Sequence, residues 1–313
     1  MHRTEKSRHR VSRPDGIRPG VGALIVLSLF ASPDQIHADE ARIRLDGQNP
    51  RIEVLTLVST HQSGPNRIFV IHPAPLQSNK DRLKAASRRY LYVLPVEAGE
   101  QRGWGNPLQV ILNSETVHRE QLTCIYPTFS DLPWYCDHPE RSDRAQESFL
   151  VHAVLPAVER RFPTTAGQPQ RLLIGFSKSG WGALSLLLRN PGHFAGAAAW
   201  DAPLMMDRPG RYGSGPIFGN QTCFEQHQLS RRITELAPTG PFFDEARIVH
   251  GGYGGFQQHH VDFETLLQSR RLPHLFLDGP QRKHHWESGW FEPCLKALLT
   301  GTAKESTDSP ARN

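Results

Sequence analysis

Residues 171–190 read RLLIGFSKSGWGALSLLLRN and place an apolar run, a glycine-flanked serine and an amphipathic helix in direct succession. The run Arg171–Gly175 predicts a short buried parallel strand, because a continuous apolar run of this length ends at a turn residue. Alanine and leucine residues recur at helical spacing over 183–188, and the Asn-Pro-Gly triplet at 190–192 predicts the end of that helix. A sharp turn from strand to helix would lift the Ser177 hydroxyl above the sheet edge, at a helix amino end that favours negative charge. A nucleophilic serine needs this position.

The turn itself, Gly175-Phe176-Ser177-Lys178-Ser179, is a near match to the G-x-S-x-G motif. Three residues of common types carry little information alone, but the strand and helix that the motif requires are both predicted here. Ser179 replaces the second glycine, and its small side chain still allows close packing. The plainer alternative is a Gly/Ser turn that only packs a strand on a helix. We interpret the stretch as a nucleophile elbow. No G-x-x-x-x-G-K-[ST] string occurs, which argues against a phosphate loop.

The first 38 residues are typical of a targeting segment. Six basic residues precede an apolar stretch at 21–31 that is too short to span a bilayer as a helix. We expect a signal peptide at 1–38, cleaved after Ala31 or, preferably, Ala38, although an uncleaved anchor is the alternative. The mature chain would then be secreted or periplasmic, without stable membrane insertion.

Removing this segment changes the charge argument. Residues 1–38 contain six of the 36 basic residues and three of the 31 acidic ones, so the remainder is nearly neutral. A neutral body gives no electrostatic reason to expect a nucleic-acid partner. Residues 39–300 are enough for one α/β domain, and the polar residues 301–313 suggest a disordered tail.

The four cysteines could form two disulfides in an exported chain, in any of three pairings. The two that are closest in sequence, Cys124 and Cys136, would close a short loop and are the first choice. Free buried thiols are the alternative, and the spacing suits no common zinc module. The other cysteines are Cys223 and Cys294.

Strand-like and helical patterns alternate along the body of the chain, which predicts a mostly parallel sheet covered by helices on both faces. Expected strands cover 51–59, 67–72, 89–94, 122–127, 171–175, 194–200, 246–250 and 272–277, the first two as a pair. Expected helices cover 107–119, 142–162, 183–190, 229–236, 261–270 and the residues beyond 291. Pro156 should bend the second helix.

This order of elements, together with the elbow and the helix end Arg189-Asn190-Pro191, resembles the α/β-hydrolase fold. Within it, the chain is similar to the esterase branch that includes S-formylglutathione hydrolases and feruloyl esterases. The resemblance covers roughly residues 67–299. It implies a Ser-His-acid hydrolase that acts on an ester or related acyl bond. Fold-level analogy carries no function unless the other groups are found.

The base should follow the last strand, because the triad of this fold runs Ser, acid, His along the chain. Two adjacent histidines, His284 and His285, lie there. Members of the branch often carry an aromatic residue two positions after the histidine, which favours His284 through Trp286. Both could also be solvated histidines of a basic loop.

The acid departs from the family pattern. Relatives usually carry it after the penultimate strand, where the glycine-rich residues 251–260 contain no carboxylate. Asp201 stands at the carboxyl end of the preceding strand, where catalytic groups of open α/β sheets gather. Asp262 is the first carboxylate beyond the glycine run. We favour Asp201 over Asp262; either could be only a helix cap or turn residue.

The oxyanion should be bound by two backbone N–H groups. One is that of Lys178, which follows the nucleophile, and the resemblance places the other at Glu97, in an atypical turn at 94–99. We expect Trp134 and Trp286 to line the substrate pocket, with ordinary core packing as the alternative. The reaction requires no cofactor and no metal, and no H-E-x-x-H spacing occurs.

The sequence therefore predicts an exported serine hydrolase of the carboxylesterase type that cleaves a small or medium ester through an acyl-enzyme. A catalytically inactive pseudo-hydrolase that binds a carbohydrate or peptide is the main alternative, because the usual acid position is empty. An acyltransferase that passes the acyl group to a sugar hydroxyl would use the same triad.

Overall fold

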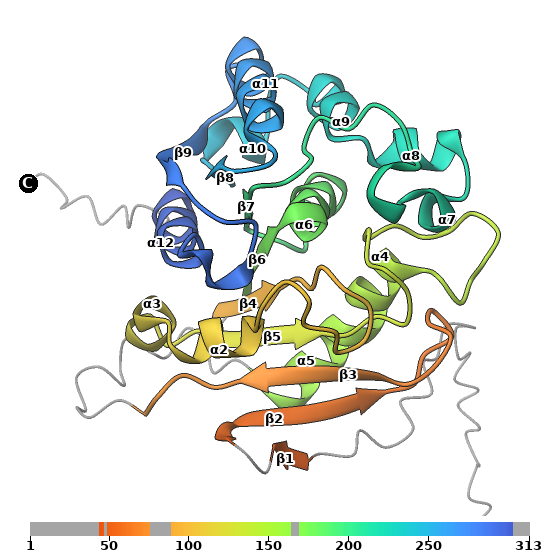
Figure 1. Cartoon of the computed structure of the whole chain (residues 1–313), viewed down its shortest axis with the longest axis vertical. Helices are drawn as coiled ribbons and strands as arrows, with labels where there is room; N and C mark the ends of the chain where they lie inside the picture. The colour runs from red at the N-terminus through yellow and green to blue at the C-terminus, as the bar shows by residue number, and fades with distance from the viewer. Residues whose placement is uncertain (1–43, 47–48, 76–88, 164–168, 303–313) are drawn as a thin grey trace, which may run out of the picture. The chain divides into compact units, whose positions relative to one another are not determined.

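A nine-stranded sheet organises the residues that the computed structural model describes, which are 44–46, 49–75, 89–163 and 169–302 (Figure 1). Its strand order is β1-β2-β3-β5-β4-β6-β7-β8-β9. Strands β4 to β9 are mutually parallel, whereas β1, β2 and β3 add an antiparallel edge. The strands are β1 (Arg44–Asp46), β2 (Asn49–Leu57), β3 (Asn66–Ile71), β4 (Arg89–Val93), β5 (Thr123–Pro127), β6 (Gln170–Phe176), β7 (Gly196–Trp200), β8 (Ile248–Tyr253) and β9 (His274–Gln281).

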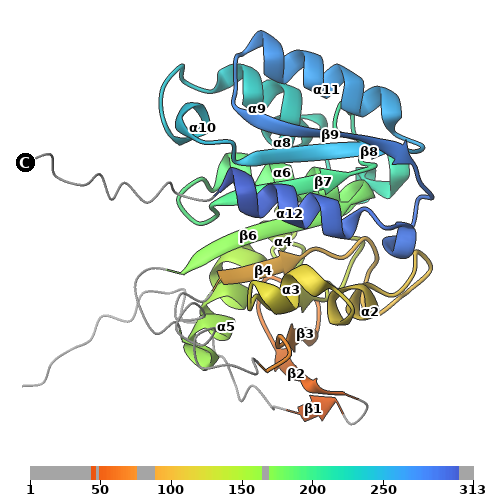
Figure 2. The same ribbon diagram turned by 90° about the vertical axis from the view of Figure 1, so that its left-hand side faces the viewer.

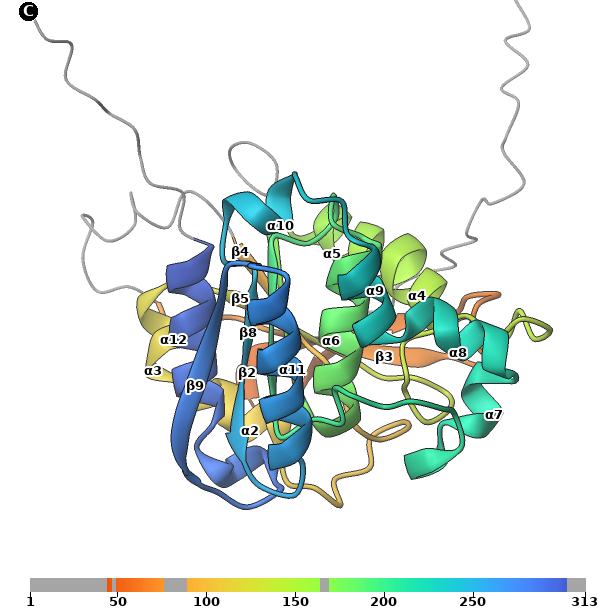
Figure 3. The same cartoon turned by 90° about the horizontal axis from the view of Figure 1, so that it is seen from above.

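Helices cover both faces of this sheet (Figures 2 and 3). One face carries α2 (Pro107–Leu112), α3 (Glu115–Arg119) and α12 (Phe291–Gly301). The other carries α4 (Gln146–Ser148), η1 (Phe149–Val154), α5 (Leu155–Arg161), α6 (Ser177–Arg189), α8 (Gln221–His227), α9 (Leu229–Glu235) and α11 (Gln257–Ser269). Shorter helical turns are η2 (Arg211–Gly213), α7 (Gly215–Phe218), α10 (Pro241–Asp244) and η3 (Trp286–Ser288). The predicted mixed α/β architecture, mostly parallel and covered on both faces, is confirmed.

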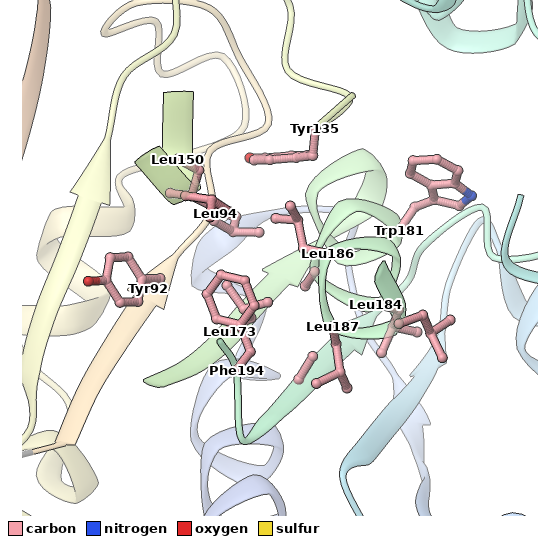
Figure 4. Close-up of a cluster of buried hydrophobic side chains, with 14 of the residues drawn as sticks. Tyr92, Leu94, Tyr135, Leu150, Leu173, Trp181, Leu184, Leu186, Leu187 and Phe194 are labelled. Atoms are coloured by element: carbon pink, nitrogen blue, oxygen red, sulfur yellow. The ribbon is translucent and has the colours of Figure 1, made fainter. Parts of the chain in front are cut away.

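The alternation of side chains along the strands divides the core into two layers. On the α6 side, Leu173 of β6 packs with Leu184 and Leu187 of the helix (Figure 4). On the α12 side, its neighbour Ile174 packs with Leu295 and Leu298. A strand that is apolar on both faces reads as a continuous hydrophobic run, which is the pattern seen at 172–174. The central strand β6 is therefore fixed from both sides.

Two predicted helices are interrupted. The expected helix 107–119 is two helices, because the Ser114 hydroxyl accepts the N–H of Val117 and starts α3 as an N-cap. The expected helix 142–162 contains a π-helical segment, Phe149–Val154, just before Pro156. Proline has no N–H to donate to the preceding turn, and the wider segment accommodates that loss. No helix of the described part combines the length and apolar character needed to cross a bilayer.

The predicted Cys124–Cys136 disulfide is wrong. Cys124 packs in the core layer on the α12 side, and Cys136 packs in the layer on the α6 side, so the sheet separates them. All four cysteines are free and buried. Cys136 instead lies beside Cys223, and hydrogen bonding between the two thiols lowers the pKa of Cys223. The expected signal peptide at 1–38 lies outside the described residues, as do residues 303–313 of the expected tail.

Glu147 joins the end of α6 to the helices beside it. Its carboxylate accepts hydrogen bonds from Arg189 at 2.8 Å and Asn190 at 2.7 Å, and His227 lies 3.5 Å away. Burial alone would raise the pKa of Glu147, but the contact with His227, the charge of Arg189 and the hydrogen bond from Asn190 lower it to about 2.

The lowered pKa of Glu147 predicts that the folded chain loses stability in acid. A carboxyl group whose pKa is lower in the folded chain than in the unfolded chain stabilises the fold at neutral pH, and loses that contribution as the pH falls through the folded pKa. We expect Glu147 to contribute about 3 kcal/mol above pH ~4.5, lost as the pH approaches ~2. Urea unfolding at several pH values should therefore give a flatter pH dependence for Glu147→Gln than for the wild type. Parallel curves would contradict this expectation.

Candidate active site

Ser177 stands at the junction of β6 and α6 in a strained backbone conformation, with φ of 54°. Non-glycine residues rarely adopt positive φ, and functional sites are where such strain concentrates. The turn is tight: a Cβ at Gly175 would lie 2.5 Å from the carbonyl oxygen of Ser179. Ser179 closes it, because its hydroxyl accepts the N–H of Phe176 at 3.1 Å and donates to the Phe176 carbonyl at 2.9 Å. Ser179, which replaces the second glycine of the motif, thus stabilises the turn through two hydrogen bonds to the Phe176 backbone.

His284 meets the Ser177 hydroxyl from the loop after β9. Its Nε2 lies 3.0 Å from Ser177 Oγ, and its Nδ1 lies 2.6 Å from Asp201 Oδ2. The imidazole ring packs against Phe176 at 5.1 Å between centroids and against Trp104 at the same distance. These contacts hold the ring between the serine and the carboxylate.

Asp201 follows β7 directly and is almost fully buried. Its second oxygen, Oδ1, accepts the N–H of Phe256 at 2.9 Å. The glycine run after β8 makes room for the carboxylate, since a Cβ at Gly254 would lie 2.4 Å from Asp201 Oδ2. Asp201 has φ of 40°, and its carbonyl accepts the N–H of Ser177 at 3.2 Å. The glycine-rich segment after β8, which carries no carboxylate of its own, therefore makes room for Asp201 at the end of the neighbouring strand β7.

The structure separates the alternatives that the sequence left open. The ring of His285 points to Glu287, with Nδ1 2.9 Å from the carboxylate. Asp262 lies on α11, where it accepts a hydrogen bond from Gln258 at 2.8 Å. The structure brings neither His285 nor Asp262 to Ser177.

A cavity of about 510 Å³ opens above Ser177 and His284. Ligand pockets of 300–1,000 Å³ with mainly apolar walls are typical of small-molecule sites. Aromatic side chains form much of the wall, and Tyr212 and Phe256 pack edge to face at 5.3 Å. The lining residues are Trp104, Ser177, Lys178, Pro203, Tyr212, Gly255, Phe256 and His284.

The two tryptophans predicted to line the pocket lie elsewhere. Trp134 is fully buried and packs against Trp181 at 5.6 Å, in the core on the α6 side. Trp286 is buried in the other core layer, where its ring meets Phe176 at 4.9 Å. Neither side chain lines the cavity, so the pocket assignment of both is corrected. Trp286 instead packs against Phe176, the residue before Ser177 in the turn.

Of the two predicted oxyanion donors, Lys178 lines the cavity. It is the second residue of α6, and the first N–H groups of a helix have no partner within it. Its side chain donates to the Val96 carbonyl at 2.9 Å. Burial lowers the pKa of Lys178, and the carboxylate of Glu97 opposes this effect.

Glu97 is not among the residues that line the cavity, but its carboxylate accepts the N–H groups of Gly103 at 3.1 Å and Trp104 at 3.4 Å. The Trp104 carbonyl in turn accepts the N–H of Trp286, beside the histidine loop. An unusual glutamate in the predicted oxyanion turn thus orders the loop that brings Trp104 against His284. Sequence reasoning missed Trp104, Tyr212 and Phe256, because Trp104 and Phe256 lie in loops and Tyr212 lies in the three-residue turn η2, all without a periodic pattern.

Comparison with known proteins agrees with this fold. Residues 130–233 match the family described as "Putative esterase". The structure is similar to an S-formylglutathione hydrolase from Agrobacterium tumefaciens, with a TM-score of 0.61, 15% identity, and coverage of 80% of this chain and 95% of that chain. The chain has the α/β-hydrolase fold, and its residues 130–233 match an esterase family.

Other solved structures share this fold. A ferulic acid esterase has a TM-score of 0.59 at 18% identity, and covers 80% of this chain and 97% of its own. The fluorophosphonate-binding serine hydrolase FphF of Staphylococcus aureus has a TM-score of 0.58 at 18% identity, with 80% and 98% covered. In sequence, Esterase MT1326 and Esterase Rv1288 of Mycobacterium tuberculosis are each 33% identical to the α/β-hydrolase over 131 residues, 40% of this chain. The chain spans 26% of the length of these curated relatives.

Proposed function

We propose that the protein is a serine hydrolase of the carboxylesterase type, with Ser177 as nucleophile, His284 as base and Asp201 as acid. The observation that carries the proposal is the hydrogen-bonded line Ser177 Oγ, His284 Nε2, His284 Nδ1 and Asp201 Oδ2, with contacts of 3.0 and 2.6 Å. A serine hydroxyl is a weak nucleophile until a base within hydrogen-bond reach accepts its proton. The arrangement supplies that base in a defined orientation.

The protonation of His284 follows from its neighbours. Asp201 accepts the Nδ1–H, which leaves the lone pair of Nε2 to accept the proton of Ser177. Attack on an ester carbonyl then gives a tetrahedral oxyanion, to which the N–H of Lys178 donates. Collapse releases the alcohol, which takes the proton from His284, and leaves Ser177 acylated. Water activated by the same histidine hydrolyses the acyl-enzyme.

The cavity favours a small or medium ester with an apolar acyl or alcohol group. Its walls are aromatic at Trp104, Tyr212 and Phe256, and its volume of about 510 Å³ is too small for a large lipid. The absence of a carboxylate after β8 was the main argument for a pseudo-hydrolase. Because Asp201 reaches His284 from the neighbouring strand, that argument no longer favours a catalytically inactive protein.

The proposal is tested by labelling the folded chain with a fluorophosphonate, which phosphonylates only activated serines. We expect one adduct per chain, mapped to Ser177 by peptide mass spectrometry, with the buried Ser179 two residues away unmodified. Denatured wild type and Ser177→Ala serve as controls and should remain unlabelled. A folded wild type without label, or equal labelling of Ser177→Ala, would refute the proposed nucleophile.

A further inference from the structure

Three side chains of the described residues converge at the edge of the sheet, outside the cavity. They are His250 of β8, Glu264 of α11 and His274 of β9. Glu264 Oε2 lies 3.0 Å from His250 Nε2 and 2.8 Å from His274 Nε2. All three atoms lie within 4.8 Å of one another. His250 is fully buried, whereas His274 and Glu264 are partly exposed, so the group can be reached from solvent.

Surrounding contacts orient each of these side chains toward the same point. His274 Nδ1 donates to the Leu272 carbonyl at 2.6 Å, so its Nε2 faces Glu264. Gln268 donates to Glu264 Oε1 at 2.6 Å, which leaves Oε2 directed between the two rings. Outer hydrogen bonds of this kind fix ring tautomers and carboxylate orientation in metal sites.

Aromatic packing completes the orientation of the buried histidine. The ring of His250 stacks on Phe276 at 4.8 Å and meets Phe263 edge to face at 5.2 Å. The three donor atoms are therefore held by packing and hydrogen bonds. They are not free to reorient as surface side chains are.

We propose that His250, Glu264 and His274 form a binding site for a divalent transition-metal ion of the zinc type. Two imidazole nitrogens and one carboxylate oxygen suit such ions, whereas calcium and magnesium prefer oxygen ligands. Zinc bound at 2.0–2.2 Å by tetrahedral ligands separates its donor atoms by about 3.3–3.6 Å. The observed separations of 2.8 and 3.0 Å need only small side-chain movements to reach that range. Three protein ligands leave a position for water.

This site is connected to the acid of the triad through one more histidine. His260 Nε2 accepts the N–H of Ala202 at 2.9 Å, and Ala202 follows Asp201. The remaining proton of the neutral His260 ring is therefore on Nδ1, which faces His250 Nδ1 at 3.3 Å. In the metal-free arrangement His250 Nδ1 accepts a hydrogen bond from this N–H, and His250 Nε2 donates a hydrogen bond to Glu264.

A metal ion bound to His250 Nε2 would reverse the direction of the hydrogen bond between His250 and His260. The single ring proton of His250 must then be on Nδ1, where it opposes the proton of His260. Moving the His260 proton to Nε2 relieves the conflict and ends the bond to the Ala202 N–H. Occupation of the site thus disturbs the residue beside Asp201, and we expect the ion to lower turnover. This second step rests on the proposed function, whereas metal binding itself does not.

Titration of the metal-free full chain with zinc chloride, followed by calorimetry, tests the site. We expect one ion per chain and a higher melting temperature with zinc. His274→Gln and Glu264→Gln should each weaken binding at least tenfold. His72→Gln is the matched control, because His72 also lies 3.0 Å from a glutamate, Glu53, and should leave binding unchanged.

Cobalt chloride gives an independent readout on the unmutated chain, since a four-coordinate cobalt ion absorbs far more strongly in the visible range than the hydrated ion. A spectrum of hydrated cobalt, or zinc binding that survives both His274→Gln and Glu264→Gln, would overturn the proposal and indicate adventitious binding to other histidines. In ester hydrolysis, zinc should inhibit the wild type and spare His274→Gln. Equal inhibition of both would refute the connection to Asp201. Calorimetry gives the metal result even if no esterase activity is found.

Discussion

Ser177→Ala should lower kcat for p-nitrophenyl acetate by roughly 10⁶-fold, and His284→Ala should have an effect of the same size. The reason is the single proton path between Ser177 Oγ and His284 Nε2, which are 3.0 Å apart: without either group, no nucleophile forms. The double variant should be no slower than either single variant, because residues that act as a unit are not additive.

His285→Ala is the matched control for the base. His285 pairs with Glu287 and does not reach the serine, so its replacement should change kcat by less than about threefold. Near-ultraviolet circular dichroism checks that each variant is folded. Equal losses in His284→Ala and His285→Ala, or additive losses in the double variant, would contradict the assignment of His284 as base.

Asp201→Asn should lower kcat by roughly 10⁴-fold with a much smaller change in KM. Asp201 Oδ1 accepts the N–H of Phe256, so the amide oxygen of an asparagine takes that place and its NH₂ group faces His284. The Nδ1 atom of His284 must then accept a hydrogen bond. Its proton moves to Nε2, where it blocks the proton path from Ser177.

Asp262→Asn is the matched control for the acid. Asp262 contacts Gln258 on the exposed side of α11, and its replacement should change kcat by less than about twofold. The two variants are compared under identical conditions over a range of substrate concentrations, to separate kcat from KM. A wild-type kcat in Asp201→Asn, or a large loss in Asp262→Asn, would reverse our choice of acid.

The fold and the elbow were predictable because their signals are local. The apolar run at 171–175, the turn residues and the helical spacing beyond Ser177 lie within 20 residues, and the alternation of such segments predicts a parallel sheet. The geometry around Ser177, with its positive φ and the contact to His284, agrees with that interpretation.

The pocket was not predictable for a physical reason. The sequence does not distinguish Trp134 and Trp286 from Trp104, because contacts between distant segments decide which tryptophan ring is buried. Glu97 holds the loop of Trp104 against the histidine loop, and no spacing in the sequence reports a carboxylate that accepts backbone N–H groups six and seven residues away. The choice of disulfide failed similarly, since closeness along the chain places Cys124 and Cys136 together and the sheet separates them.

The pairing of β6 with β7 has a consequence for how this active site can change during evolution. Phe176 and Trp200 are register partners on these neighbouring strands, and the proposed nucleophile and acid are the residues that follow them. The spacing between Ser177 and Asp201 is thus set by the strand repeat of about 4.8 Å, and not by the length of any loop. Trp104, Tyr212 and Phe256 lie instead in the connections between the strands and the longer helices. Insertions in those connections can alter substrate choice while the proposed nucleophile and acid keep their separation.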